Sequence, residues 1–215
     1  MNSEINNDVT AKSRMCRNPN HPVKGSSTKV EPIRSDRDIK NIKKLIADKP
    51  RDLAIFTFGI NTNLRASDLL RLKIGNVLYV RPGEEFTIRE KKTKKLRNIT
   101  MNKTVYDAVQ GLLATMDTSD EDAYLFQSRK GKVSGGKLTE TYLNKLVKGW
   151  GRQINLKCNL GSHSLRKTMG YVHRTKFNTD IPTLMEMFNH STQKQTLAYL
   201  GIQPQEIQSA YLKEI

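Results

Sequence analysis

Apolar residues recur at helical spacing along most of the chain. In the segment 36–46 they stand three or four positions apart, the spacing that gathers side chains on one face of an α-helix. Ser35 precedes this segment as a candidate N-cap, with Asp36 and Asp38 in the predicted first turn. Similar patterns predict a turn into a short helix over 64–70 and helices over residues 51–60, 103–116, 140–154, 164–176, 181–188, 192–199 and 204–213.

A different pattern occupies residues 76–101. Three short runs, 77–80, 85–89 and 96–100, are rich in β-branched and aromatic residues, and they are separated by Pro82-Gly83 and by a cluster of lysines. Such runs are typical of strands, and such breaks are typical of turns. The fold is therefore predicted to be mainly α with a small antiparallel β-sheet (α+β), without an internal repeat.

The first 32 residues follow neither pattern. They are rich in Asn, Ser, Lys, Pro and Gly, a composition that favours a flexible chain over a packed element. A chain of 215 residues is long enough to bury one substantial core. We therefore expect a flexible basic tail over residues 1–32 and one main domain over residues 33–215.

Charge narrows the range of partners. Lys and Arg number 37 against 21 Asp and Glu, which gives a formal charge of +16. This balance favours a polyanion, with nucleic acid first among the candidates, and the basic tail could either hold phosphates or be solvated without a role. No apolar run approaches the ~20 residues of a membrane span, and the polar N-terminus is not a signal peptide. We expect no membrane partner and a cytoplasmic, nucleoid-associated location.

The two cysteines, Cys16 and Cys158, stand far apart and in unlike contexts, so a disulfide framework is not expected. Cys16 with His21 could begin a metal site, but structural zinc needs about four ligands and no second pair lies nearby. No carboxylate cluster suited to Mg²⁺ is evident either. The sequence predicts neither a metal nor a cofactor.

Two pairs of polar residues near the C-terminus could carry chemistry. His163 and Arg166 are three apart at a predicted helix start, so they share a face near backbone amides that favour a phosphate. Further on, His190 lies in a predicted turn and Tyr199 in the last turn of a short helix. Taken alone, the first pair could be an ordinary polar helix face, and Tyr199 a half-buried core residue. If a tyrosine of this region acts as a nucleophile, Tyr211 is the alternative to Tyr199.

Together these motifs resemble those of the tyrosine recombinase family, the lambda-integrase-like site-specific recombinases. The family pairs an early Leu-Arg-x-Ser-Glu/Asp segment with a late His-x-Leu-Arg, a turn containing histidine, and a tyrosine nine residues later. The matching segments are Leu64-Arg65-Ala66-Ser67-Asp68, His163-Ser164-Leu165-Arg166, and Asn189-His190-Ser191 followed by Tyr199. The family's hairpin lysine falls in Glu90–Lys94, where the Lys-Thr dipeptide favours Lys92 while Lys91 and Lys94 also fit.

The resemblance covers roughly residues 33–215 and implies a catalytic domain there. It implies that Arg65 and Arg166 bind the scissile phosphate, with hydrogen bonds from His163 and His190. Tyr199 would attack to give a 3′-phosphotyrosine, and Lys92 would protonate the leaving 5′-oxygen. The implied partners are double-stranded DNA and further copies of the chain assembled on it. The segment after Tyr199 would either dock on a neighbouring copy or pack on its own core.

Two features depart from the family's pattern. Asn189 stands where many relatives have glycine, although Asn also tolerates left-handed backbone angles. Relatives usually carry a separate helical domain before the catalytic one, and the ~32 residues before the predicted domain are too few for it. The competing interpretations are DNA relaxation of the type IB topoisomerase kind and DNA binding without catalysis, for which the charge alone would suffice.

Overall fold

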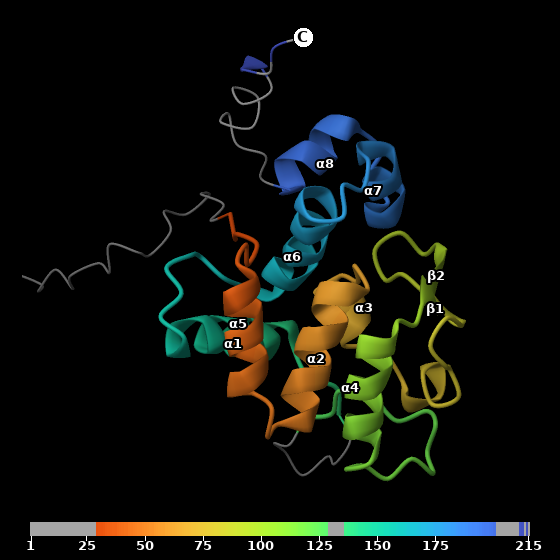
Figure 1. The fold of residues 1–215 in the computed structure, drawn as a ribbon. Coiled ribbons are helices and arrows are strands. Elements are labelled where there is room, and N and C mark those ends of the chain that lie inside the picture. The colour runs from red at the N-terminus through yellow and green to blue at the C-terminus, as the bar shows by residue number, and fades with distance from the viewer. Residues whose placement is uncertain (1–28, 129–135, 201–210, 213, 215) are drawn as a thin grey trace, which may run out of the picture.

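The predicted mainly helical fold is present in the computed structural model, which describes residues 29–128, 136–200, 211, 212 and 214 (Figure 1). The elements in chain order are α1 (Asp36–Leu45), α2 (Pro50–Asn61), α3 (Ala66–Leu69), the 3₁₀ helix η1 (Ile74–Asn76), β1 (Glu85–Arg89), β2 (Leu96–Thr100), α4 (Lys103–Leu113), α5 (Glu140–Gln153), α6 (Ser162–Thr175), α7 (Ile181–Phe188) and α8 (Gln193–Leu200).

Helix α2 lies in the centre of the main core. Its stretch from Ala54 to Gly59 is buried on all sides, as expected for a helix that is apolar around its whole circumference. It packs against α4 and α6. Phe56 meets Trp150 of α5 edge to face at 5.8 Å between ring centroids, and Phe58 meets Phe86 of β1 at 6.1 Å. The core therefore ties the helices to the sheet around α2.

The sheet consists of β1 and β2, paired antiparallel with Phe86 opposite Ile99. These two residues face the core, while most of their strand neighbours are exposed, the alternation of a sheet with one buried face. The prediction of a further strand over residues 77–80, before β1, is wrong. Val77 and Leu78 donate their backbone N–H groups to Ile74 O, so the chain turns out of η1, and Val77 fills the core from a turn.

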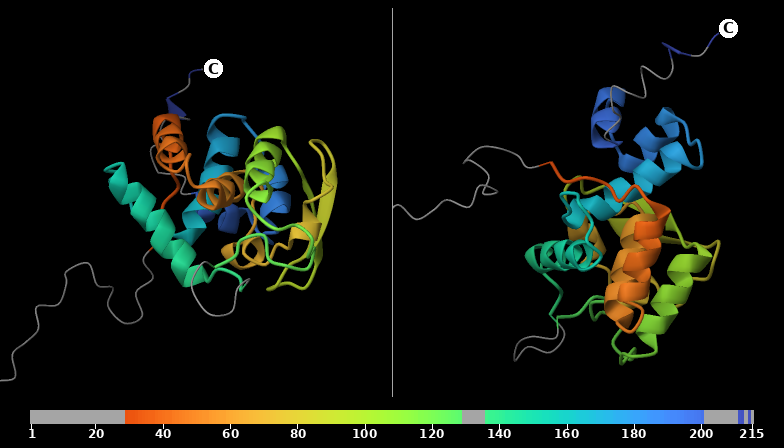
Figure 2. Two further views of the ribbon diagram at one scale, coloured as in Figure 1. Left: turned by 90° about the horizontal axis from the view of Figure 1, so that it is seen from below. Right: turned by 60° about the vertical axis from the view of Figure 1, so that its left-hand side comes forward.

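Helices α7 and α8 form a small second core at one end of the molecule (Figure 2). Leu184, Phe188 and Leu200 are its buried members. Both helices rest on α6, and the contact is close at Gly170. A Cβ atom there would lie 2.4 Å from Phe188 Cζ and 2.7 Å from Leu200 Cδ2, so only glycine lets α6 approach this closely.

The described chain begins with an extended segment pinned to α6. Ile33 is fully buried, its N–H donates to Thr168 Oγ1 at 2.8 Å, and Glu31 N–H donates to Asn159 O at 2.8 Å. The predicted tail up to residue 28, Cys16 and His21 included, and residues 204–210 of the predicted last helix lie outside the described residues. Over the part of the chain that is described, no helix has the length and apolarity to cross a membrane.

Candidate active site

A cleft of about 730 Å³ opens between the start of α3, the loop after β1, the start of α6 and the α7–α8 region. All six residues predicted to carry chemistry line it: Arg65, Lys92, His163, Arg166, His190 and Tyr199. They come from segments up to 134 residues apart in the sequence. The fold therefore brings the predicted set together in one place.

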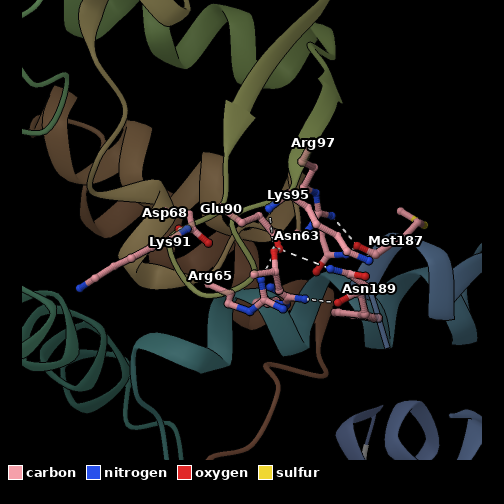
Figure 3. A network of polar contacts seen from close by, with 12 residues as sticks. Asn63, Arg65, Asp68, Glu90, Lys91, Lys95, Arg97, Met187 and Asn189 are labelled. Carbon is pink, nitrogen blue, oxygen red and sulfur yellow. Dashed lines mark hydrogen bonds and ion pairs between the residues drawn. The ribbon is translucent and has the colours of Figure 1, made fainter. Parts of the chain in front are cut away.

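Arg65 occupies the N-cap position of α3 in an extended conformation. Its neighbours Leu64 and Ala66 are buried and fix the backbone, so the side chain turns toward the cleft. The guanidinium Nη1 lies 2.8 Å from Glu90 Oε1. Arg97 of β2 places its own Nη1 3.1 Å from the same oxygen. Figure 3 shows this carboxylate between the two arginines.

Glu90 has further partners and is only 2% exposed. Thr93 Oγ1 donates to Oε2 at 2.6 Å, and Asn189 Nδ2 donates to Oε2 at 3.4 Å. Burial alone would raise the pKa of this carboxyl group, but the hydrogen bond from Thr93 and the contacts with the two arginines outweigh it and lower the pKa to about 2. Glu90 is therefore ionised at any working pH.

The loop after β1 presents two lysines, Lys92 and Lys95, to the cleft. Lys91 and Lys94 do not line it. The backbone of Lys91 donates to Asp68 Oδ1 at 2.8 Å while its side chain extends away from Glu90 (Figure 3). Lys94 adopts a positive φ of 61°, a turn conformation. The geometry favours Lys92 among the lysines considered from the sequence, and it adds Lys95, which the sequence interpretation missed.

Arg166 projects from the first turns of α6 and is 3% exposed. Its Nη2 donates to Phe188 O at 2.7 Å, and its guanidinium carbon lies 5.2 Å from the Phe188 ring centroid. Nη1 is buried and has no hydrogen-bond partner among the described residues. Burial lowers the pKa of Arg166 to about 10, so the group stays charged and holds a donor ready for an anion.

His163 lies at the start of α6, partly exposed on the rim of the cleft. Partial burial and the nearby charge of Arg166 lower the pKa of His163 below 6.5. The imidazole is therefore mostly neutral at pH 7, and it can accept a proton or donate a hydrogen bond from one nitrogen.

His190 follows the turn that ends α7. Asn189 makes this turn at φ 52° and ψ 50°, the left-handed conformation expected for an Asn that stands in place of glycine. His190 Nδ1 lies 3.0 Å from Thr196 Oγ1, which orients the ring. Burial, together with the charges of Arg166 and Arg65, lowers the pKa of His190 to about 4, so this imidazole is also neutral at pH 7.

Tyr199 lies in the last turn of α8, as predicted. Its ring packs 5.1 Å from that of Phe188 and 5.3 Å from that of His190, between centroids. The hydroxyl oxygen is buried, and no described residue hydrogen-bonds to it. Burial raises the pKa of Tyr199 above 10, although Arg166 and Arg65 oppose this rise. The phenol is therefore protonated at rest, and a nucleophilic role would require a proton acceptor.

The site contains residues that no motif predicted. Glu90 is a lone carboxylate within a run of lysines, which is the one local signal that pointed to it. Arg97 donates to Met187 O in addition to its contact with Glu90, and Lys167 Nζ lies 5.2 Å from the Tyr199 ring centroid. In the described ranges, no three His, Cys, Asp or Glu residues gather as metal ligands.

Comparison with known proteins covers most of the chain. The model of the phage integrase family matches residues 36–206. The probable integrase/recombinase YoeC of Bacillus subtilis strain 168 is 32% identical over 183 residues, which make up 85% of this chain and 95% of YoeC. The tyrosine recombinase XerA of Pyrococcus horikoshii strain OT-3 is 28% identical over 174 residues, or 80% of this chain and 58% of XerA.

A solved structure has the same fold. The XerH site-specific recombinase, bound to palindromic difH substrate in a post-cleavage complex, matches with a TM-score of 0.68 at 20% identity, over 89% of this chain and 55% of the XerH chain. The chain thus spans nearly all of YoeC but little more than half of XerA and XerH. Motifs, fold and relatives agree with the prediction from sequence, and the chain belongs to the phage integrase family of tyrosine recombinases.

Proposed function

We propose that this protein cleaves and rejoins DNA strands at specific sites through a covalent bond between Tyr199 and a DNA 3′-phosphate. One observation carries the proposal. The buried hydroxyl of Tyr199 and the buried Nη1 of Arg166 both lack a partner among the described residues, and both belong to side chains that line one cleft. An unpaired buried donor is costly, and a phosphate in the cleft would satisfy it.

In this mechanism the two arginines bind the scissile phosphate. Cleavage concentrates negative charge on the non-bridging oxygens, so donors fixed before the reaction stabilise the transition state more than the ground state. Arg65 and Arg166 come from segments far apart in the sequence and line the same cleft. Both carry planar guanidinium groups that suit phosphate. One such donor typically contributes about 3 kcal/mol.

The chemical step exchanges one phosphate ester for another. Tyr199 Oη forms a bond to phosphorus as the bond from phosphorus to the 5′-oxygen breaks, and a neutral His163 or His190 accepts the phenolic proton. The Lys92 ammonium group gives a proton to the departing 5′-oxygen. The lowered pKa of each histidine keeps its imidazole neutral at pH 7, so one ring nitrogen is unprotonated and able to accept. Reversal by another 5′-hydroxyl rejoins the strands without an external energy source.

The domain and partner assignments follow from the same proposal. Residues 33–215 are assigned as the catalytic domain and residues 1–32 as a basic tail. Copies of the chain assemble on double-stranded DNA, which places the protein at the nucleoid. The XerH recombinase was solved in complex with its difH DNA substrate, and this likeness together with the charge of +16 supports DNA as the partner.

The test begins with nicked duplexes of random sequence, in which release of a short fragment traps a cleaved intermediate. Wild-type protein should form an adduct that survives a denaturing gel, and the recovered duplexes define a cleaved sequence. The Tyr199→Phe protein should form none. Exchange of strands between two duplexes of that sequence supports recombination, whereas relaxation of a supercoiled plasmid without exchange would favour the topoisomerase alternative. Salt-sensitive binding without any adduct would contradict catalysis altogether.

A further inference from the structure

Glu90 joins three segments that border the cleft (Figure 3). It contacts Arg65 at the start of α3 and Asn189 at the end of α7. Within its own loop it accepts from Thr93 Oγ1, and its backbone pairs with Lys94 and Lys95. A side chain that is 2% exposed and has contacts in all three segments can control how they lie relative to one another.

The Glu90 carboxylate also offsets the repulsion between the guanidinium groups of Arg65 and Arg97. Arg65 and Arg97 both place Nη1 within 3.1 Å of a single oxygen, Glu90 Oε1. Two like charges this close repel each other, and the repulsion is stronger away from water than in it. Arg97 is also held by the Met187 carbonyl, whereas Glu90 is the only charged partner of Arg65 in the part of the chain that the structure describes. Loss of the carboxylate would therefore release Arg65 first.

We propose that Glu90 is a positioning residue that holds the Arg65 guanidinium in the orientation that binds the scissile phosphate. This inference rests on the proposed function, because it assigns Glu90 a role through a proposed phosphate ligand. The ion pair engages Nη1 of Arg65, and the same side chain lines the cleft. A guanidinium can hold a carboxylate on one edge and a phosphate on another.

A competing role for Glu90 is to shape the loop that carries Lys92, since Thr93 is also its partner. The two roles respond differently to the leaving group. A DNA substrate with sulfur in place of the bridging 5′-oxygen leaves as a thiolate and needs no proton, so a defect in the general acid disappears on it. A defect in phosphate binding by Arg65 persists, because the non-bridging oxygens are unchanged.

The experiment measures covalent adduct formation on the cleaved sequence with oxygen or sulfur at the bridging position. The variant is Glu90→Gln, which keeps the size of the side chain and removes its charge. Glu85→Gln is the matched control, because Glu85 is exposed on β1 of the same hairpin and changes the net charge equally. Lys92→Ala lacks the proposed general acid, so its rate on the sulfur substrate shows how fully sulfur restores cleavage when no proton is supplied. Thermal unfolding and DNA affinity are measured on each variant.

We expect Glu90→Gln to slow the adduct between about 10-fold and 100-fold on both substrates, as expected for a displaced donor. DNA affinity should stay within about twofold of that of Glu85→Gln, since both lose one negative charge. Lys92→Ala should be slow on oxygen and fast on sulfur. A Glu90→Gln rate equal to that of Glu85→Gln, or a full rescue by sulfur, would overturn the inference.

A second variant, Glu90→Asp, and the wild-type protein provide further outcomes. If Glu90→Gln unfolds below the assay temperature, Glu90→Asp keeps the charge with a shorter reach and should show a smaller defect that also persists on sulfur, whereas a wild-type rate would count against the inference. Absence of an adduct with wild-type protein on every DNA is a failure of the proposed function itself, and it is distinct from any result with Glu90.

Discussion

The side chains in the cleft differ in whether they are charged or neutral at pH 7. Arg166 stays charged in spite of burial, while the imidazole of His190 and the phenol of Tyr199 are both neutral at pH 7 because burial disfavours their charged forms. Cationic side chains therefore lie near a neutral phenol, the proposed nucleophile, and a neutral imidazole, the proposed proton acceptor. This arrangement suits attack on an anionic phosphate, since the positive charge is in place before negative charge develops.

The titration of His190 tests this arrangement in the DNA-free protein. Its pKa lies at about 4, so the imidazole should stay neutral as the pH falls from 8 to 5 and gain its proton only below that. The ring resonances, followed by NMR and assigned with a His190→Asn variant, should move little above pH 5. Arg65→Gln removes one of the charges that lower this pKa and should shift the midpoint upward. A midpoint near 6.5 in the wild type would refute the arrangement.

Replacement of Arg166 by lysine tests the need for a guanidinium fork. Arg166 donates to Phe188 O through one nitrogen and leaves another unpaired, and a lysine ammonium group cannot span both positions. Adduct formation by Arg166→Lys should fall roughly 100-fold or more. Arg174→Lys, on the same helix but away from the lining of the cleft, is the control and should cleave at the wild-type rate. Equal rates for the two variants would remove Arg166 from the mechanism.

Among the elements, those with long periodic patterns were predictable. The helices from α4 to α8 and both strands of the hairpin match the expected segments to within a few residues, because an apolar stripe or a two-residue alternation specifies each locally. The 77–80 run failed because four apolar residues suit a strand and a core turn equally. Apart from the lone carboxylate among lysines, nothing local indicated the Glu90 network, since two of its partners, Arg65 and Asn189, stand 25 and 99 residues away and meet Glu90 only through tertiary packing.

The close packing of α7 and α8 against α6 can be tested by a substitution at Gly170. A methyl group there meets the Phe188 ring and Leu200, and overpacking of this kind costs about 1–3 kcal/mol. Gly170→Ala should lower the melting temperature and slow the adduct, because α8 carries Tyr199. Gly111→Ala in α4 has no atom within 4 Å of the new Cβ and should instead stabilise by up to ~1 kcal/mol. Gly170→Ala with unchanged melting and cleavage would contradict the close packing.

At the scale of the whole molecule, net charge and cleft have separate tasks. In the proposed function, the charge of +16 attracts DNA of any sequence, whereas the six residues that line the cleft act only where a phosphate reaches Tyr199. Binding and chemistry should therefore respond to different changes.

This separation predicts how salt acts. If the protein contacts six or more phosphates, affinity for duplex DNA should fall about 1000-fold or more between 50 and 200 mM salt. Tyr199→Phe keeps every charge and should show the same affinity and the same slope in a fluorescence anisotropy titration. A weak salt dependence would mean that contacts other than phosphates dominate binding.

The proposed function depends above all on covalent attachment of Tyr199 to DNA. The most direct measurement digests the trapped adduct with protease and nuclease and locates the nucleotide by mass spectrometry. We expect a 3′-phosphate on Tyr199, in the peptide that contains Leu197 to Leu200, and no adduct in Tyr199→Phe. A nucleotide on Tyr211 or on any other residue, or an adduct that survives in Tyr199→Phe, would contradict it.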